Sequence, residues 1–192
     1  AGNDAVDATP DSLFRAVYEP DSGPVGTSLD DYGTRIHKFD LEGGPAHPVY
    51  VASGRVDGWT HNSFAMDEAN KTFRIVTSSW NHGGLRGTSG TSTGLYMLQQ
   101  DGNRLEEIGS TEGIAPDETI YAVRFTDDIA YVVTFLQIDP LFTIDLRDPT
   151  SPEVLGELEV TGYSTYMHPL DDGHLLAVGE ASAANVIAAG ND

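Results

Sequence analysis

ETIYAVRFTDDIAYVVTFLQIDPLFTIDLRDPTSPEVLGELEVTG, residues 118–162, contains four short apolar runs separated by turn-forming residues. Residues 120–125 alternate apolar and polar side chains, which predicts a half-buried strand. Residues 130–135 (AYVVTF) form a continuous β-branched and aromatic run, as expected of a strand buried on both faces. Residues 141–146 and 154–160 predict two further strands. The segment therefore predicts a unit of four antiparallel strands.

The same order of strands recurs along the chain, at residues 63–67, 73–78, 95–98 and 105–109. Before it, residues 13–18, 35–41 and 49–56 match the second, third and fourth strands of a unit. After residue 162, residues 165–169 and 174–179 match the first and second strands of another. Four strands in about 45 residues is the size of one propeller blade, so the repeat favours an all-β propeller. An ordinary antiparallel sandwich is the alternative.

Several segments carry a resemblance to a known family: IHKFDL (36–41), YVASGRVDGWTHNSFAMDE (50–68), FRIVTS (73–78), IYAVRFTDDIAYVVTF (120–135) and DPLFTIDLRDPTSPEVLGELEVTGYSTYMHP (139–169). They resemble a family of secreted prokaryotic β-propeller domains, distant relatives of the WD-type propellers. The resemblance covers residues 13–179 and is most specific in the last segment. It implies a propeller fold and an extracytoplasmic address, and it supplies no catalytic residues. After Glu180 the sequence departs from the expected pattern of further blades.

The strands add up to about three blades, because the first unit lacks its first strand and the last stops after its second. Closed propellers have about four blades or more. The predicted fold is thus a partial β-propeller over residues 12–180, with a disordered leader at 1–11 and a tail at 181–192. Two explanations stay open. The chain is a fragment of a larger propeller, or two copies associate as a homodimer that closes a ring, since open strand edges favour pairing with another chain.

Composition excludes several functions. The net charge of −20 disfavours nucleic acid and anionic membrane surfaces as partners, because like charges repel. No apolar run reaches the roughly 18 residues needed to cross a bilayer, so membrane insertion is not expected. The chain has no cysteine and therefore no thiol chemistry. The acidity itself is explained by solubility in a salty medium or, alternatively, by cation binding.

The glycine-, serine- and threonine-rich insert at residues 78–94 is the least regular part of the domain. Long loops on rigid scaffolds often carry binding residues, and tryptophan and arginine are frequent anchors at interfaces. The insert contributes three candidate ligand-binding residues, Trp80, His82 and Arg86. The alternative is an insertion without a role.

Three more candidate ligand-binding residues lie where first strands begin, and first strands line the central channel of a propeller. His61 and His168 each stand at such a position and could face one another across the channel to bind a metal or an anion. Trp59 lies in the link between two units, close to His61. The structural alternatives are hydrogen bonds to strand-end carbonyls for the histidines and core packing for Trp59.

Asp145 and Asp148 are candidate metal ligands, because calcium takes oxygen ligands that loops between strands provide. The turn after residue 146 could bring their carboxylates together. In the structural alternative, Asp148 caps the Asp-Pro turn and Asp145 faces a neighbouring strand. No EF-hand or histidine-based zinc spacing occurs in the sequence. Calcium is therefore the only cofactor that the sequence suggests.

These observations favour a non-enzymatic, extracytoplasmic binding or scaffold domain that presents loops to a protein or carbohydrate partner. The alternative is a metal-dependent or hydrolase-type enzyme with its site at the central channel. An enzyme should bring at least three polar groups together in one pocket, for example those of His61, Asp67 and His168. A binding domain should instead expose Trp59 or Trp80.

Overall fold

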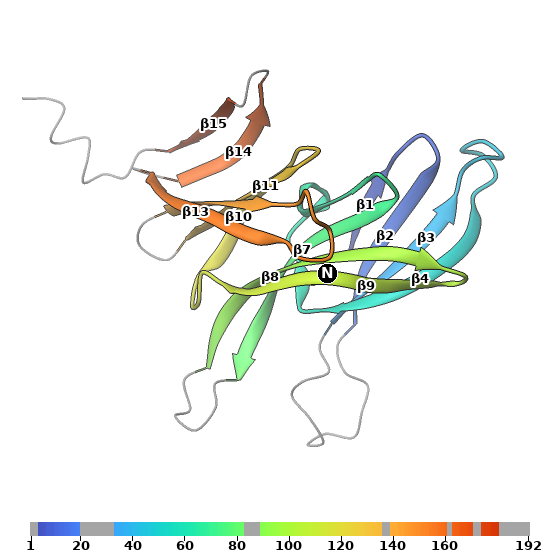
Figure 1. Cartoon of the computed structure of the whole chain (residues 1–192), viewed down its shortest axis with the longest axis horizontal. Coiled ribbons are helices and arrows are strands. Elements are labelled where there is room, and N and C mark those ends of the chain that lie inside the picture. The colour runs from blue at the N-terminus through green and yellow to red at the C-terminus, as the bar shows by residue number, and fades with distance from the viewer. Residues whose placement is uncertain are drawn as a thin grey trace, which may run out of the picture.

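The computed structural model describes residues 4–19, 33–82, 89–135, 139–160, 163–170 and 174–180. Within these residues the fold is all-β, as predicted, and helical structure is limited to the three-residue 3-10 turn η1 (Ser63–Ala65). No helix in this part of the chain is able to cross a bilayer. The strands form a nine-stranded sheet, a four-stranded sheet and a two-stranded hairpin (Figure 1).

The four-stranded sheet, here called unit three, confirms the strand order predicted for residues 118–162. It consists of β10 (Thr119–Phe125), β11 (Ile129–Phe135), β12 (Asp139–Asp145) and β13 (Glu153–Val160), each antiparallel to the next. Ala130, Val132 and Val133 of β11 are buried, as expected of a strand inside a sheet packed on both faces. The turn between β10 and β11 closes as the short polar side chains predict, with Thr126 N–H donating to the carbonyl of Ile129 at 2.8 Å.

Unit one contains a first strand that the sequence analysis missed. It comprises β1 (Ala5–Ala8), β2 (Ser12–Glu19), β3 (Gly33–Asp40) and β4 (Val49–Asp57), all antiparallel. The expectation of a disordered leader was wrong for residues 5–8, which pair with β2, and Ala5 is buried. Small side chains give little hydrophobic signal, but backbone pairing with β2 holds this short strand. Thr9 and Ser12 form the connecting turn, in which Ser12 N–H donates to Thr9 Oγ1 at 3.1 Å.

Unit two surrounds the long hairpin of β7 (Thr72–His82) and β8 (Ser89–Asp101), with β9 (Arg104–Ile114) on the outer side. Two short segments, β5 (Trp59–Thr60) and β6 (Met66–Ala69), both pair with β7 in the place of one first strand. The strand predicted over residues 63–67 is interrupted because Asn62 accepts a hydrogen bond from Phe64 N–H at 2.9 Å and caps η1.

The predicted irregular insert at residues 78–94 is shorter than expected, because the ladder of β7 and β8 continues to the pair His82–Ser89. Serine and threonine side chains in this part of the hairpin tolerate the extended conformation, and threonine favours it. The remaining residues of the insert between the two strands, 83–88, lie outside the described residues.

The core lies between the faces of successive units. Phe14 of unit one and Phe73 of unit two stack with ring centroids 4.4 Å apart, and both are buried. A second cluster joins Val76 and Met97 of unit two to residues of unit three, and a third packs Met167 of β14 (Tyr163–Pro169) against unit three. Sheets that pack face to face in sequence order are the arrangement of propeller blades. The total number of blades stays a prediction.

The remaining strand, β15 (Leu175–Glu180), pairs with β14 to form the two-stranded hairpin (Figure 1). Units one and two also meet at their outer strands, through a parallel bridge between Ser53 of β4 and Arg104 of β9. The segments that begin successive units also contact one another: β1 contacts β6, η1 contacts β10, and β10 contacts β14. Residues 181–192, the predicted tail, lie outside the described residues.

Candidate functional site

The link from β4 to β5 is held tightly against β7, and this fixes the position of Trp59. Gly58 adopts a φ of +77°, and an added Cβ would lie 2.1 Å from the carbonyl oxygen of Ser78, so only glycine fits there. Thr34 Oγ1 donates to the carbonyl of Gly58 at 2.8 Å, and Thr77 Oγ1 donates to that of Asp57 at 2.7 Å. These contacts fix the backbone just before β5 and therefore the position of Trp59.

Trp59 and Trp80 meet because of the strand register. Trp59 pairs with Ser78, and Trp80 lies two residues further along β7, so the two indoles are diagonal neighbours on one face. Their ring centroids are 5.4 Å apart, and the ring of Tyr18 meets Trp59 edge-on at 6.5 Å. Trp80 is 53% exposed, whereas Trp59 is half-buried behind it. The pair presents one braced, solvent-facing indole.

Trp80 forms part of the wall of a hollow of about 250 Å³, here called the tryptophan pocket. Its other lining residues are polar or small: Asp57, Ser79, Ser92, Thr93, Gly94, Tyr96, Glu112 and Gly113. The carboxylates of Asp57 and Glu112 belong to exposed residues at the ends of β4 and β9. The pocket thus combines an aromatic surface with two carboxylates that accept hydrogen bonds.

Tyr96 fixes one of these carboxylates. Its hydroxyl donates a hydrogen bond to Glu112 Oε1 at 2.9 Å, and burial together with this carboxylate raises the pKa of Tyr96 above its usual value. Gly94 makes the geometry possible, because an added Cβ would lie 2.9 Å from the tyrosine oxygen. Tyr96 therefore stays a neutral donor and leaves Glu112 Oε2 for other partners.

Of the residues predicted to bind a ligand, the structure brings Trp59 and Trp80 together. His82 ends the same strand as Trp80, but its side chain lies outside the described residues, and so does all of Arg86. His61 follows β5, and desolvation lowers the pKa of its imidazole. His168 lies on β14, where its ring stacks on that of Tyr166 with centroids 6.4 Å apart.

Two of the polar groups proposed for a channel site, Asp67 and His168, have other described partners. Asp67 accepts a hydrogen bond from Arg74 Nε at 2.6 Å, and the ring partner of His168 is Tyr166 rather than His61. Burial raises the pKa of the Asp67 carboxyl, and the bond from Arg74 opposes that rise. Asp67 thus serves a buried ion pair in this structure.

The two candidate metal ligands are engaged within their own turn. Asp145 accepts from the backbone N–H of Arg147 at 2.9 Å and pairs with its guanidinium, which lowers the pKa of Asp145 to about 2. Asp148 accepts from Thr150 N–H at 2.9 Å and from its hydroxyl at 2.7 Å, and these bonds lower its pKa. Within the described residues no three acidic or histidine side chains form a group suited to a metal ion. Calcium binding here stays a prediction.

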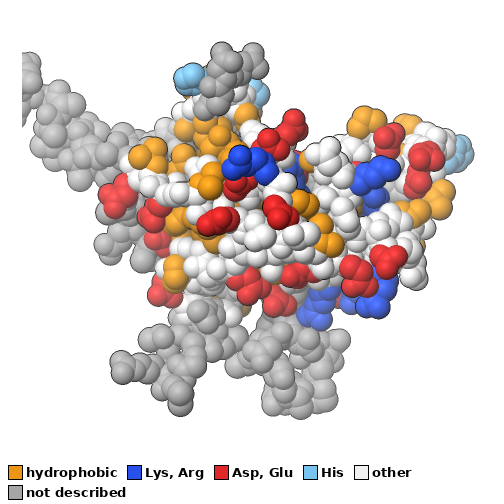
Figure 2. All heavy atoms as spheres, in the orientation of Figure 1, with side chains coloured by type: hydrophobic (Ala, Val, Ile, Leu, Met, Phe, Trp, Pro, Cys, Tyr) orange, Lys and Arg blue, Asp and Glu red, His pale blue; other side chains and the backbone are white. Residues whose placement is uncertain are grey.

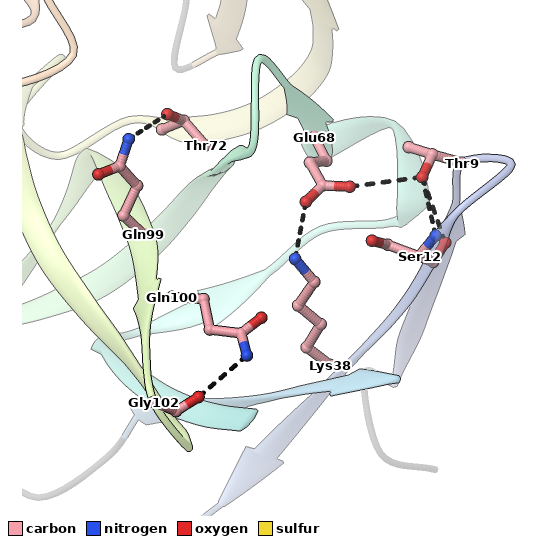
Figure 3. A network of polar contacts seen from close by, with 8 residues as sticks. All are labelled: Thr9, Ser12, Lys38, Glu68, Thr72, Gln99, Gln100 and Gly102. Atoms are coloured by element: carbon pink, nitrogen blue, oxygen red, sulfur yellow. Dashed lines mark hydrogen bonds and ion pairs between the residues drawn. The ribbon is translucent and has the colours of Figure 1, made fainter. Parts of the chain in front are cut away.

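A larger hollow of about 440 Å³ lies at the opposite end of β7 and β8, between units one and two. Figure 3 shows that several of its polar side chains form hydrogen bonds. Lys38 Nζ donates to Glu68 Oε1 at 3.0 Å, and Thr9 Oγ1 donates to Glu68 Oε2 at 3.4 Å. Gln100 Nε2 donates to the carbonyl of Gly102 at 2.9 Å. This network links two units, so we assign it a structural role.

Sequence reasoning missed the residues that complete the tryptophan pocket: Asp57, Tyr96 and Glu112. They come from β4, β8 and β9, and only the register of these strands brings them to one place. On the face shown in Figure 2, acidic side chains are spread over the surface, so acidity alone did not mark a site. The usable sequence signal was the two tryptophans, Trp59 and Trp80, each named separately.

Comparison with known proteins agrees with this architecture. Residues 6–190 match the sequence model of the beta propeller domain family, so the match extends past Glu180, where we expected the chain to depart. An uncharacterized protein of Methanocaldococcus jannaschii is 42% identical over 77% of this chain and 22% of its own length. An uncharacterized protein of Archaeoglobus fulgidus is 38% identical over 76% of this chain and 21% of its own.

This chain spans about a fifth of the length of these curated relatives. The family match covers both the sheets and the hairpin described above. The chain therefore belongs to the beta propeller domain family.

Proposed function

We propose that this chain is a non-enzymatic binding domain of an extracytoplasmic protein and that it holds a carbohydrate in the tryptophan pocket. The observation that carries the proposal is the exposed indole of Trp80, braced by Trp59 beside the carboxylates of Asp57 and Glu112. Aromatic residues positioned on rigid strands lose little entropy when a ligand binds.

A sugar ring has the chemistry that this pocket fits. One face of the ring carries C–H groups that pack on an indole, and its rim carries hydroxyls that both donate and accept hydrogen bonds. The carboxylates of Asp57 and Glu112 accept from such hydroxyls, and charge-assisted hydrogen bonds are about twice as strong as neutral ones. The pocket therefore offers a stacking surface and directional acceptors for the same ligand.

The size and lining of the pocket favour carbohydrate over a protein partner. A volume of about 250 Å³ suits a small ligand group, whereas a stable protein interface buries roughly 800 Å² on each partner. Interface centres are also depleted in aspartate and glutamate, and this pocket has one of each. A neutral sugar carries no charge for the net charge of −20 to repel.

The extracytoplasmic address rests on the resemblance of segments 36–41 and 139–169 to secreted propeller domains, and the absence of cysteine is compatible with it. A metal-dependent or hydrolase-type enzyme is the second candidate in sequence terms. Among the described residues, no observation supports an enzyme as directly as the exposed indole of Trp80, packed on Trp59, supports binding.

The test is calorimetric titration of the chain with soluble oligosaccharides of glucose, mannose, galactose and N-acetylglucosamine, followed in parallel by tryptophan fluorescence. We expect at least one oligosaccharide to bind. Trp80→Ala should weaken its affinity by at least about tenfold, which corresponds to about 1.4 kcal/mol. Glu112→Gln, which keeps the shape of the side chain, should weaken it by a similar factor.

Tyr50→Ala is the matched control, because Tyr50 is 52% exposed on β4 and lies outside the residues that line the pocket. It should bind the oligosaccharide as well as the parent chain. Equal affinity of the parent and the Trp80→Ala variant, or no binding of any of the four classes, would overturn the proposal. Capture of a protein that competes for Trp80 would replace carbohydrate by a protein partner.

A further inference from the structure

Arg124 on β10 lies against two aromatic rings. Its guanidinium carbon lies 3.5 Å from the ring centroid of Phe64 in η1 and 4.9 Å from that of Tyr166 on β14. Its Nε donates a hydrogen bond to the carbonyl of Met167 at 2.6 Å. These contacts join unit two, unit three and the hairpin at the segments that begin them, η1, β10 and β14.

The pairing of Arg124 is unusual for this chain, which has 30 acidic and 10 basic residues. Six described basic side chains form ion pairs: Arg15, Arg35, Lys38, Arg74, Arg104 and Arg147. Within the described part of the chain, Arg124 has no carboxylate at ion-pair distance, although acidic residues outnumber basic ones threefold. Among the described residues, the fixed positive charge of Arg124 thus lies apart from the acidic side chains.

Comparison with Arg74 shows which guanidinium nitrogens of Arg124 have no hydrogen-bond partner among the described residues. Arg74 also lies against a ring, that of Phe125, but it uses Nε and Nη2 on Asp67 and Nη1 on the carbonyl of Asp127. Arg124 uses only Nε among the described residues. Its two Nη groups form a planar fork, and the rings and the Met167 carbonyl fix the orientation of that fork in advance.

We propose that the Arg124 fork binds the carboxylate of a ligand whose apolar part lies on the exposed rings of Phe64 and Tyr166. A guanidinium fork matches the planar geometry of a carboxylate and donates two parallel hydrogen bonds to it. A carboxylate carries a single negative charge, so a surface of net charge −20 repels it less than it repels a phosphate dianion. His168 stacks on Tyr166 and extends the aromatic surface.

This site is separate from the tryptophan pocket, since none of its residues lines that pocket. The two proposals therefore fail independently. The site also accounts for the prediction that His168 takes part in binding, through its ring and its position on a first strand, without a partner imidazole.

The experiment uses benzoate as the probe and follows the Nε–H resonance of Arg124 by NMR. We expect benzoate to shift this resonance with a Kd of about 1 mM, an affinity suited to one fork and two rings. Benzamide, which has the same shape without the charge, should leave the resonance in place. Acetate should bind more weakly than benzoate, because it lacks the apolar part.

Arg124→Lys keeps the charge and loses the fork, so it should weaken benzoate binding by about tenfold or more. Arg104→Ala is the control, because Arg104 is exposed and forms an ion pair with Glu106 on β9. A purely structural Arg124 would lower the melting temperature on substitution, and benzoate would not move its resonance. That result, or equal binding by Arg124→Lys and the parent chain, would overturn the proposal.

Discussion

Arg74 on β7 donates two hydrogen bonds to the carboxylate of Asp67 on the neighbouring strand β6, from Nε at 2.6 Å and from Nη2. The third side-chain nitrogen, Nη1, donates to the carbonyl of Asp127 in the β10–β11 turn at 2.8 Å. The Arg74 side chain is almost completely buried. One buried arginine thus satisfies a partly buried carboxylate and joins unit two to unit three.

Replacing Arg74 by Met should destabilise the protein by about 2–3 kcal/mol, because it leaves the partly buried Asp67 carboxylate without its partner. Urea unfolding at neutral pH measures this loss. The double variant Arg74→Met, Asp67→Asn removes the unpaired charge, so it should recover part of the stability. If the single variant loses less than about 1 kcal/mol, the ion pair is not what holds these units together.

The same variant should show a distinctive pH dependence. Burial already raises the pKa of Asp67, and loss of the Arg74 bond should raise it further. A carboxyl whose folded pKa exceeds its unfolded value binds more protons in the folded state, so stability falls as pH rises between those two values. We expect the stability of Arg74→Met to fall from about pH 4 upward more steeply than that of the parent, and the double variant to lose this slope.

The strands that the sequence predicted are those whose side chains form a clear apolar or alternating pattern. Residues 130–135 form a buried apolar run, and they form β11 at nearly the same boundaries. Strand β1 was missed because its stability comes from backbone pairing with β2, which side-chain composition does not reveal. The ends of β7 and β8 were missed because serine, threonine and glycine are common to loops and to hairpin ladders.

For the candidate site, too, the sequence revealed individual side chains but not the strand pairing that brings them together. Trp59 and Trp80 were singled out separately, Trp80 as an aromatic anchor in the insert and Trp59 in the link between two units. Their contact depends on the pairing of Trp59 with Ser78, which only the folded sheet sets. Glu112 reaches the pocket through the register of β8 and β9, which contains two irregularities, and no local pattern predicts it.

Strand β1 can be tested with two neighbouring substitutions. Ala5 is 5% exposed and Val6 is 51% exposed, so adjacent positions of the strand face opposite environments. Ala5→Glu should lower stability by several kcal/mol, because it places a charge in a closed space, whereas Val6→Glu should change it by about 0.5 kcal/mol or less. Thermal unfolding measures both variants. A disordered leader would respond equally, and weakly, to the two changes.

Two glycines separate backbone strain from steric clash, and only one of them, Gly58, lies next to the tryptophan pocket. Gly102 has a φ of +60° and open space around an added Cβ, whereas at Gly58, with φ +77°, an added Cβ would meet the Ser78 carbonyl oxygen at 2.1 Å. Gly102→Ala should destabilise the protein by about 1–2 kcal/mol, because the left-handed backbone alone opposes it. Gly58→Ala should destabilise it more and alter the fluorescence of Trp59 and Trp80. Equal losses of stability would show that the link is free to move away from β7.

The lowered pKa of the Asp145 carboxyl can be measured directly by titration. Because Arg147 holds the pKa of Asp145 at about 2, NMR should detect its carboxyl titrating near pH 2, and Arg147→Ala should move the midpoint toward 3.8. The sign follows from the lowered pKa: the contribution of this turn to stability is present above pH 3.8 and is lost as pH falls toward 2. The carboxylates of Asp145 and Asp148 both have partners within the turn, so calcium should leave the melting temperature unchanged. A rise that Asp145→Asn abolishes would instead establish a calcium site.

The edge strands β13 and β15 expose apolar side chains that a packed sheet would bury, including Leu158 and Leu176. Strand β15 corresponds in order to β11, whose Ala130 and Val132 are buried, so the exposure of Leu176 marks a face that another sheet would cover. Apolar faces and open strand edges favour pairing with a second copy of the chain. We therefore expect light scattering to detect a homodimer at increasing protein concentration.

Leu158→Lys and Leu176→Lys should shift this equilibrium toward monomer, because each places a charge on the face to be covered. Val49→Lys is the control, since Val49 is also exposed but lies on β4 in unit one. If the parent chain keeps the mass of a monomer at every concentration, the two exposed faces do not mediate self-association. A dimer that only Val49→Lys disrupts would place the contact at unit one instead.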